Sequence, residues 1–565
     1  MTPIHILYLQ LPLLDNDTQA ERENFPFAAA YLDHALTQSP EAPFHTTTFA
    51  PAAWDELGNP ALADAILAAR PTILVCTLYL WNIERTRRLA TLLKEKNPRL
   101  KIAVGGPEVA HEHPLLFQGL EFDAVVTGEG EGVFPALLNH WRTNAPIDFE
   151  NLALPTSKGW KFGTTPAPTV DLVVAQPPEE TIMRCVQHRP VVYLETVRGC
   201  PLTCSYCRYY QLHTGLRALS PDQVMARIRR FRDLGAKEIR FVDPTFNARA
   251  GFTALLEQLA KLNADQQLSF FAEIRSDTLT EKQANLMRDA HFTAVEVGVQ
   301  SIDPQVLANV ARPVRFDRVA AGIQYLCHAG VHIVLDIMYG LPGQTLGEVR
   351  RSLDWALTFG SSVQVQCMQT LALPGTVLRN DSKRWNFDSA PLPPYGIQKT
   401  EHLSPADIRE IEILLDEHPE LPADLTTPRF CGQRLYGLFK NQHRIGLQSL
   451  NVPVPGVGNR RTLLFYGADL FGSCAAIGDL IDRAIEEEPD TLWQFVLIPE
   501  YEEPLDLLEK LAQRIRCHPA HLLDRFASAA AFDLILSRRL YIRTNPNFSN
   551  DWIGAAEELL QGFFG

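Results

Sequence analysis

The chain has 565 residues, of which 46% are hydrophobic and 21% charged, and its formal net charge is −14. This composition is ordinary for a globular protein of several domains, and the negative charge argues against nucleic acid or an anionic membrane surface as a general partner. No apolar run is long enough to span a membrane, and the first residues lack the charged region and cleavage site of a signal peptide. We therefore expect no membrane span, and a cytoplasmic protein with reduced thiols.

Residues 1–145 alternate between short apolar runs and helical patterns. Strands are expected at 4–9, 72–78, 101–104 and 124–127, and helices at 26–36, 83–94 and 133–141. This alternation predicts an α/β domain with a parallel, doubly wound (Rossmann-like) sheet. Gly105 and Gly106 follow one expected strand, and Gly128 and Glu129 follow the next. Ligands bind such sheets beyond the carboxyl ends of the strands, where glycine lets them approach the backbone, so we predict a cofactor site there.

Strand and helix patterns alternate again from residue 190 to about residue 400, after an expected linker at 146–189 that is rich in Pro, Thr and Gly. Strands are expected at 191–196, 238–243, 268–274, 293–299, 331–338 and 363–371, and helices at 221–235, 250–262, 281–290, 316–329 and 346–359. These βα units are too few to close an eightfold barrel. The pattern predicts a partial (βα)6 barrel with its chemistry at the carboxyl ends of the strands.

The first expected barrel strand leads into the stretch ETVRGCPLTCSYCRYY, which holds Cys200, Cys204 and Cys207 in a C-x3-C-x2-C spacing. Three thiolates can ligate three corners of a 4Fe-4S cluster, which normally takes four, and this leaves one iron open to another ligand. A zinc site completed by His213, or a disulfide with a spare thiol, are alternatives for this loop. The strand before it and the helix after it favour the cluster.

Polar residues and glycines follow the later barrel strands, where a plain core would not need them. They are Asp243 after the second strand, Glu273 and Arg275 after the third, Gln300 and Ser301 after the fourth, and Gly340 after the fifth. Glu296 and Asp336 lie within strands, where an interior salt bridge or hydrogen bond is an equal alternative to a ligand contact.

The cysteine loop and the motifs FVDPTFN, VEVGVQS and YGLPGQT occur in order, one per strand, and together they resemble the radical S-adenosylmethionine (radical SAM) superfamily. The earlier segments TLYLWNIE, VGGPEV and VTGEGEGVF resemble the cobalamin-binding domain that precedes many radical SAM barrels. The better-known cobalamin domains carry an Asp-x-His-x-x-Gly motif after the first strand. Here that region reads LQLPLLDNDTQAERENF without a histidine, and His5 is expected to be structural.

This resemblance implies a 4Fe-4S cluster on the three cysteines, SAM on its open iron, and cobalamin on the N-terminal domain. It implies that Asp243 serves the SAM amino group, that Gln300 and Ser301 serve the ribose, and that the backbone at Gly340 lies near the adenine. An arginine such as Arg275 suits the SAM carboxylate, and a carboxyl such as Glu273 suits the ammonium or ribose. For cobalamin we expect contacts at the glycine loops named above.

Residues 401–565 are expected to form a mixed α/β or mainly helical extension of unknown function. Helices are expected at 405–415, 476–487, 505–516, 519–535 and 555–564, and strands at 461–466 and 492–498. The region resembles the extension found on some cobalamin-type radical SAM proteins, which suggests that it covers the barrel mouth.

The resemblance implies an enzyme, most simply one that methylates an unactivated carbon of an unidentified small molecule or peptide, with flavodoxin or ferredoxin as an electron donor. One alternative is a radical rearrangement or cyclisation without methyl transfer, with or without cobalamin. Another, of a different class, is a non-catalytic iron–sulfur or zinc protein that keeps the fold.

Overall fold

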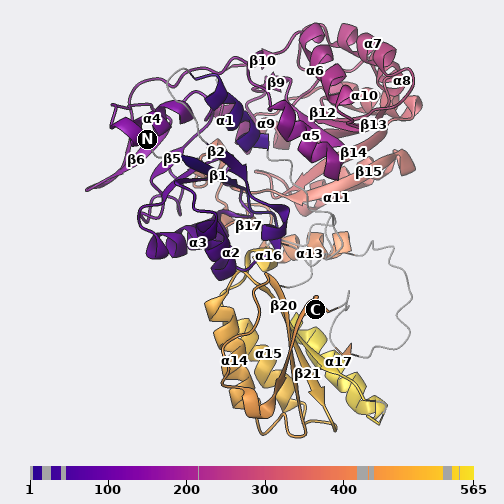
Figure 1. Ribbon diagram of the computed structural model, residues 1–565. Coiled ribbons are helices and arrows are strands. Elements are labelled where there is room, and N and C mark those ends of the chain that lie inside the picture. The colour runs from indigo at the N-terminus through magenta and orange to yellow at the C-terminus, as the bar shows by residue number, and fades with distance from the viewer. Residues whose placement is uncertain are drawn as a thin grey trace.

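Three parallel or mostly parallel sheets organise the molecule (Figure 1). The computed structural model describes residues 4–14, 27–39, 46–213, 215–416, 430–431, 438–525, 537–545 and 547–564. In Figure 1 the N-terminal sheet lies in the indigo and purple part, the second sheet lies in the magenta to pink part, and the third lies below both in orange and yellow.

The N-terminal sheet has the strand order β2-β1-β3-β4-β5-β6-β7, parallel from β2 to β5 and antiparallel beyond. Its strands are β1 (His5–Leu9), β2 (Thr46–Phe49), β3 (Ile73–Thr77), β4 (Lys101–Gly105), β5 (Ala124–Val126), β6 (Leu152–Thr156) and β7 (Gly159–Phe162). Its helices are α1 (Phe27–Thr37), α2 (Asn59–Ala68), α3 (Ile83–Lys96) and α4 (Phe134–Thr143). Alternate residues of β1 pack on opposite faces, Leu7 with α2 and α3 and Ile6 with α1 and α4, which confirms the doubly wound sheet.

Several elements of this region were not expected. β2 and α2 have no counterpart in the sequence prediction, and 146–189 contains the β6–β7 hairpin and helix α5 (Glu179–His188) where only a linker was expected. The hairpin is short and turns at Gly159, whose φ is 108°. Short edge strands give too few residues for a period-2 pattern to be recognised in the sequence.

The central sheet has the order β15-β14-β13-β12-β11-β8 and is parallel throughout, as expected for a partial barrel. Its strands are β8 (Val191–Leu194), β11 (Glu238–Phe241), β12 (Ser269–Ile274), β13 (Phe292–Gln300), β14 (His332–Tyr339) and β15 (Val363–Gln369). Its outer helices are α6 (Pro221–Asp233), α7 (Phe252–Leu262), α8 (Glu281–Asp289), α10 (Phe316–Ala329) and α11 (Leu346–Leu357). Shorter elements nearby are α9 (Pro304–Asn309), α12 (Val377–Asn380), β16 (Asp388–Ser389) and β17 (Ile397–Lys399), and helix α13 (Pro405–Asp416) follows them.

Local sequence fixes where three of the barrel helices begin. The side chains of Ser220, Thr280 and Thr345 each accept a hydrogen bond from the backbone N–H three residues later. The side chain at that later position in turn accepts a hydrogen bond from the backbone N–H of the cap residue. This reciprocal capping box satisfies backbone groups that a helix start would otherwise leave unpaired. The barrel helices then pack on one face of the sheet, while the other face lines the barrel interior.

The C-terminal domain is mixed α/β, with the strand order β18-β22-β21-β20-β19. Its elements are β18 (Phe430–Cys431), β19 (Asn441–Gly446), β20 (Arg460–Gly467), α14 (Cys474–Glu487), β21 (Leu492–Pro499), α15 (Asp506–Cys517), α16 (Leu522–Arg525), β22 (Arg538–Arg543) and α17 (Asn550–Phe564). The helix expected at 519–535 is described only as α16, and residues 526–536 lie outside the described part of the chain.

This domain docks on the N-terminal domain. Asp490 accepts hydrogen bonds from Asn59 of α2 at 2.8 Å and from Arg88 of α3 at 2.7 Å, and Gly58 donates its backbone N–H to Val457 at 2.7 Å. Figure 1 shows the domain below the N-terminal domain, and Arg525 of α16 also donates to the Pro393 carbonyl, in the segment after the barrel, at 2.9 Å. That it covers the barrel mouth stays a prediction. Among the helices described, none combines the length and apolar character needed to cross a bilayer.

Candidate cluster and cofactor site

The cysteine loop begins and ends on a two-residue antiparallel ladder between β9 (Val197–Arg198) and β10 (Arg217–Ala218). Gly199, directly before the first cysteine, has a φ of 91°. A Cβ at this position would lie 1.9 Å from the carbonyl oxygen of Gly215, so only glycine fits here. The loop geometry that precedes Cys200 is thus set by close backbone packing.

The three cysteines lie on this one loop, with Cys204 buried and Cys200 and Cys207 partly exposed. Burial raises the pKa of the Cys207 thiol, and the backbone amides of Tyr209 and Tyr210 act in the opposite direction. The loop is anchored at its centre, where the Ser205 amide donates to the Val310 carbonyl at 2.9 Å. Free thiols on an anchored loop, with amides that favour the thiolate, are suited to binding iron.

The zinc alternative finds no support in this geometry. The Nδ1 atom of His213 lies 3.2 Å from Glu129, and its ring packs against Tyr209 with the centroids 4.6 Å apart. Within the described residues, no three His, Cys, Asp or Glu side chains converge closely enough to hold one metal ion. Ligands of a single zinc ion must all lie about 2.0–2.3 Å from it, whereas the corners of a cluster belong to separate irons.

Arg312 and Gln300 meet beside Cys204. Arg312 donates to the Cys204 sulfur at 3.5 Å and also donates to the carbonyl of Gly298. A Cβ on Gly298 would lie 2.5 Å from Gln300 Nε2 and 3.3 Å from Arg312. Gln300 is 8% exposed, and its Oε1 has no hydrogen-bond partner in the described structure. The sequence reasoning missed Arg312, because no motif placed this residue beside the cysteines.

Three carboxyl side chains, those of Glu273, Glu296 and Asp336, line the barrel interior on neighbouring strands. Glu273 pairs in register with Glu296, and Asp336 pairs with Gly298 on the next strand. Water reaches Glu273 inside the barrel, yet the surrounding wall desolvates its carboxyl and, with Glu296 and Asp243, raises its pKa to about 7. Burial, reinforced by the charge of Glu296 and a hydrogen bond to it, raises the pKa of Asp336 to about 9. The Oδ1 atom of Asp336 has no partner in the described structure.

Asp243 lies apart from this group, since its carboxyl is occupied by the chain itself. It is fully buried and accepts hydrogen bonds from the amides of Thr196 at 2.6 Å and Val197 at 2.8 Å. Burial raises its pKa to about 7, against the effect of these hydrogen bonds and of Arg249. Asp243 therefore holds the strand end that leads into the cysteine loop.

Two other expected contacts are also used within the protein. Arg275 forms a two-point ion pair with Asp277, at 2.9 and 2.5 Å, so its guanidinium is not free to receive a carboxylate. Ser301 accepts from the amide of Asp303 at 3.1 Å and is fully buried in that turn. Gly340 ends β14 with a φ of 88°, and an added Cβ would meet only ordinary contacts, so its conformation is what requires glycine.

The glycines of the N-terminal domain pack against the chain, which differs from the expected approach of a ligand. A Cβ on Gly106 would lie 2.6 Å from the carbonyl oxygen of Leu78, and one on Gly128 would lie 2.9 Å from that of Leu212. A Cβ on Gly105 would meet nothing closer than 3.4 Å. Glu129 is held by ion pairs, described below. Of the four predicted residues, Gly105 alone has neither a tight backbone neighbour nor a side chain already in use.

Aromatic side chains lie at the same edge of the N-terminal sheet. Tyr79 and Trp81 follow β3, stack with ring centroids 4.3 Å apart at 9°, and are half-buried. His5, by contrast, uses both ring nitrogens within the domain, with Nε2 3.0 Å from Thr48 Oγ1 and Nδ1 3.3 Å from the Arg70 carbonyl. This confirms the structural role expected for His5.

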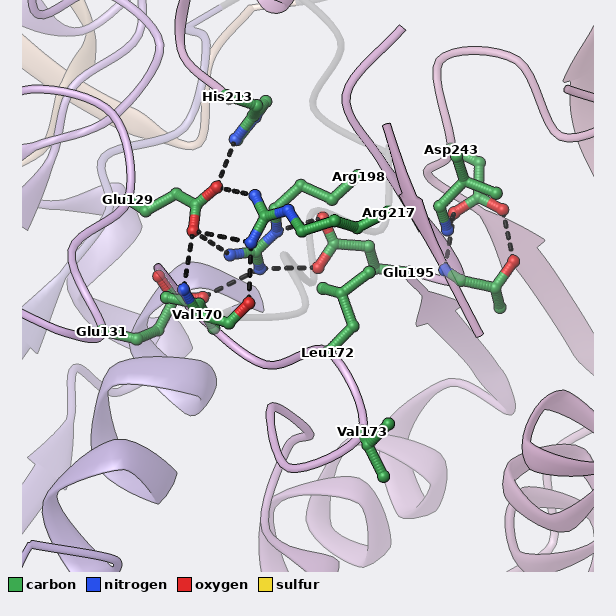
Figure 2. Close-up of polar contacts among 12 residues, drawn as sticks. Glu129, Glu131, Val170, Leu172, Val173, Glu195, Arg198, His213, Arg217 and Asp243 are labelled. Carbon is green, nitrogen blue, oxygen red and sulfur yellow. Dashed lines mark hydrogen bonds and ion pairs between the residues drawn. The ribbon is translucent and has the colours of Figure 1, made fainter. Parts of the chain in front are cut away.

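The carboxyl edge of the N-terminal sheet faces the cysteine loop. Arg208, next to Cys207, donates to the carbonyl of Val109 in the loop after β4 at 2.9 Å. The carbonyl of Leu212 packs on Gly128 in the loop after β5. Figure 2 shows Glu129 pointing from that loop toward Arg198 and Arg217 on the two strands of the loop base.

Models of known families match both the barrel and the N-terminal domain. A model described as the Radical SAM superfamily matches residues 194–356, and one described as a B12 binding domain matches residues 23–138. The chain combines a B12-binding domain with a radical SAM domain. The radical SAM domain implies a 4Fe-4S cluster and SAM, and the B12-binding domain implies cobalamin.

Among relatives, cobalamin-dependent radical SAM methyltransferase TokK of Streptomyces tokunonensis is 24% identical over 345 residues, 57% of this chain and 50% of that protein. Anaerobic magnesium-protoporphyrin IX monomethyl ester cyclase of Rubrivivax gelatinosus is 24% identical over 317 residues, 53% of this chain and 56% of that protein. The structure of radical SAM methyltransferase TsrM from Kitasatospora setae matches with a TM-score of 0.55 at 15% identity, covering 67% of this chain and 76% of that one. The chain thus spans about half the length of these curated relatives, and the structural match shows the fold.

The residues present fit these cofactors. Three free thiols on an anchored loop fit the cluster, and the partnerless buried oxygens of Gln300 and Asp336 fit a polar ligand inside the barrel. On the B12-binding domain, the open Gly105 edge and the stacked Tyr79–Trp81 pair fit a large, partly apolar cofactor.

Proposed function

We propose that this protein is a cobalamin-dependent radical SAM methyltransferase that methylates an unactivated carbon of a small molecule or peptide. The observation that carries the proposal is the direct contact between the two cofactor edges. Arg208 of the cysteine loop donates a hydrogen bond to the Val109 carbonyl after β4. The Leu212 carbonyl of the same loop packs closely against Gly128 after β5. A chemistry that uses both cofactors needs their reactive ends to face one substrate, and these contacts support that arrangement.

The cysteines would hold the cluster, and Gln300 and Glu273 would hold SAM inside the barrel. When bound, the cluster would supply the electron that cleaves SAM, and cobalamin would carry the methyl group. Arg312 balances negative charge at Cys204, and Asp243 fixes the strand end before the loop. Radical chemistry needs a site that excludes water and other hydrogen donors. The packing of the cysteine loop against the B12-binding domain supports this requirement.

Outside the cofactors, the partners follow from the chemistry. Reductive cleavage of SAM consumes an electron, so we propose a low-potential donor such as flavodoxin or ferredoxin. We also propose a cytoplasmic location, which the described cysteines support, since all of them are free thiols.

The test uses anaerobically reconstituted protein, with and without hydroxocobalamin, incubated with SAM and a reductant. Methyl donation by SAM leaves S-adenosylhomocysteine, while reductive cleavage followed by hydrogen abstraction leaves methionine and 5′-deoxyadenosine. We expect about four irons per chain and the release of both nucleoside products, with S-adenosylhomocysteine dependent on added cobalamin. A non-methylating enzyme, as the name of the Rubrivivax relative describes, would release 5′-deoxyadenosine alone. One zinc per chain and neither product would refute any radical SAM activity.

Variants of the cysteines control this test. Replacement of Cys200, Cys204 or Cys207 by alanine should abolish the cluster and the release of 5′-deoxyadenosine, which needs the electron from the cluster. Cys517→Ala removes an exposed thiol on α15 and should leave the iron content unchanged.

A further inference from the structure

A short ladder closes the base of the cysteine loop. Arg198 pairs with Arg217, and Val197 pairs with Ala218. One further backbone hydrogen bond, from the Leu219 amide to the Thr196 carbonyl at 2.9 Å, extends this ladder. A two-residue ladder contributes little stability by itself. Additional contacts are therefore needed to hold the loop in one geometry.

Glu129 of the B12-binding domain contacts both strands of this base (Figure 2). Its carboxylate lies 3.4 Å from Arg198 on the incoming strand. On the outgoing side it accepts from both Nη1, at 3.2 Å, and Nη2 of Arg217, and it lies 3.2 Å from His213 Nδ1. Its remaining contact is the amide of Val170 at 3.3 Å. One side chain from another domain thus joins the two ends of the cysteine loop.

Glu131, two residues later on the same loop, offers an internal comparison. It accepts a hydrogen bond of 2.8 Å from Arg198 and so contacts the incoming strand. Arg198 also binds Glu195 at 2.9 and 2.7 Å, within its own strand region. Glu131 and Glu129 therefore share burial and the Arg198 contact, but within the described residues only Glu129 of the two also forms ion pairs with Arg217 and His213 on the outgoing side of the loop.

Backbone packing fixes the loop at the same place. Gly128 has a φ of 65°, and its Cα faces the Leu212 carbonyl so closely that an added Cβ would lie 2.9 Å away. The loop after β5 therefore sits against the cysteine loop with no room for a side chain between them. A displacement of one loop must displace the other.

Burial makes the loss of any one partner in this ion network costly. The side chains of Glu129 and Arg198 are 11% and 5% exposed, so loss of one partner leaves a charge with little water to replace it. Buried ion networks contribute modest net stability but can select one geometry over others. The loop that carries Glu129 follows β5, at the edge where a doubly wound sheet binds its cofactor.

We propose that Glu129 is a positioning residue that couples the two cofactor sites, an inference that rests on the cofactor pair of the proposed function. Cobalamin binding orders the loop after β5, and Glu129 transmits this order to both ends of the cysteine loop. By linkage, a bound cluster must strengthen cobalamin binding by the same factor. Substrate chemistry plays no part in this coupling, so it is measurable without the substrate.

The experiment compares the Kd of hydroxocobalamin for full-length protein before and after anaerobic iron reconstitution, measured by absorbance titration. In the wild type we expect binding about five- to tenfold tighter with the cluster present, within the usual range of coupling between sites. In Glu129→Gln we expect a ratio near one, with bound iron retained. A wild-type ratio of one, or a wild-type ratio kept by Glu129→Gln, would overturn the coupling while leaving the proposed function intact. No cobalamin binding in any form would overturn both.

Glu131→Gln is the matched control, and it should keep the wild-type ratio within about twofold, since the contact of Glu129 to both strands remains. An equal loss in both variants would indicate general loosening and would refute the specific role of Glu129. The double variant Arg217→Gln/His213→Gln removes both outgoing contacts while leaving Glu129 in place, and we expect a ratio near one there too. It decides the matter if Glu129→Gln does not accumulate as folded protein, and a wild-type ratio in the double variant would then overturn the proposal.

Discussion

Tyr395 donates a hydrogen bond of 2.7 Å to Glu108, although 287 residues separate them in the chain. His113 completes the group, with Nε2 2.9 Å from Glu108, while its Nδ1 accepts the amide of Leu115 at 3.1 Å. The amide fixes the tautomer, so Nε2 carries the proton and donates to Glu108. All three side chains are buried. They join the loop after β4 of the B12-binding domain to the segment that follows the radical SAM barrel.

Tyr395→Phe removes one donor from this group and leaves the rest of the ring in place. We expect the free energy of unfolding to fall by about 1–3 kcal/mol, because the buried Glu108 carboxyl loses a hydrogen bond that water cannot replace. Urea unfolding at neutral pH measures the change. Tyr501→Phe, at a side chain 70% exposed, should change it by less than about 0.5 kcal/mol. Equal effects of the two substitutions would contradict the role of the buried hydroxyl.

The guanidinium of Arg312, 3.5 Å from the Cys204 sulfur, should tune the cluster. Reduction adds negative charge, which a nearby buried cation stabilises. We expect Arg312→Met to lower the midpoint potential on the order of 100 mV, measured by redox titration with electron paramagnetic resonance. Arg315→Met, at an exposed side chain paired with Asp317, is the control and should leave the potential unchanged. An unaltered potential in Arg312→Met would mean that the charge is screened from the cluster.

Gln300 provides a test of the ligand site inside the barrel. Its buried Oε1 has no partner in the described structure, so a bound SAM is expected to supply one. Gln300→Leu should weaken SAM binding about fivefold to tenfold, the value of one hydrogen bond, without loss of iron. Equilibrium dialysis of the reconstituted protein measures this. Gln305→Leu, on the exposed side of α9, should bind SAM as the wild type does, and identical affinities in both variants would remove Gln300 from the site.

Local patterns were sufficient for the barrel strands and helices, but they missed short elements such as β2 and the β6–β7 hairpin. Non-local contacts limited the prediction of the site. The barrel strands and the helices that begin at Ser220, Thr280 and Thr345 carry their signals within a few residues of sequence. Glu129 meets Arg217 across 88 positions of the chain, and Arg312 meets Cys204 across 108. No periodicity or spacing encodes such pairs.

The glycines also show that the sequence does not identify which group lies beside a residue in the fold. The sequence predicted that a ligand approaches the backbone at Gly128, and it could not show that the Leu212 carbonyl lies beside this glycine. Likewise, carboxyls at strand ends suggested ligand contacts, whereas Asp243 binds the amides of Thr196 and Val197. The identity of the neighbour is a property of tertiary packing.

The lowered pKa of Glu129 also predicts how the stability of the folded protein depends on pH. Burial alone would raise its pKa, but hydrogen bonds from His213 and Arg217 and the charges of Arg198 and Arg217 lower it to about 2. Because this pKa is below that of the unfolded chain, near 4.5, the folded state gains stability above pH 4.5 and loses it as pH falls toward 2. The full shift would correspond to about 3 kcal/mol at neutral pH, and screening by solvent reduces this contribution.

Urea unfolding of cluster-free protein from pH 7 to pH 3 measures this term. The difference between the wild type and Glu129→Gln should be largest at pH 7 and should shrink steadily below pH 4.5. Glu112→Gln, at an exposed position, should track the wild type at every pH. A difference that stays constant through the acid range would show that the carboxylate charge of Glu129 is not what stabilises the fold.

Asp490 should control the docking of the C-terminal domain. Its carboxylate receives Asn59 and Arg88 from two helices of the B12-binding domain, and these contacts, chiefly the hydrogen bonds and charge of Arg88, hold its pKa below the usual range despite burial. Asp490→Asn removes the charge that both the Arg88 and Arg85 side chains face. We expect a loss of about 3 kcal/mol, because a buried cation is left with an incomplete partner.

Thermal unfolding should then separate into two transitions, since the C-terminal domain has its own sheet and core and Asp490 joins it to two helices of the B12-binding domain. Asp479→Asn, which breaks an exposed pair with Arg514 within the same domain, should leave a single transition. A single transition in Asp490→Asn at the wild-type temperature would place the strength of this interface elsewhere, at the backbone contact between Gly58 and Val457 or at the ion pair between Glu84 and Arg525.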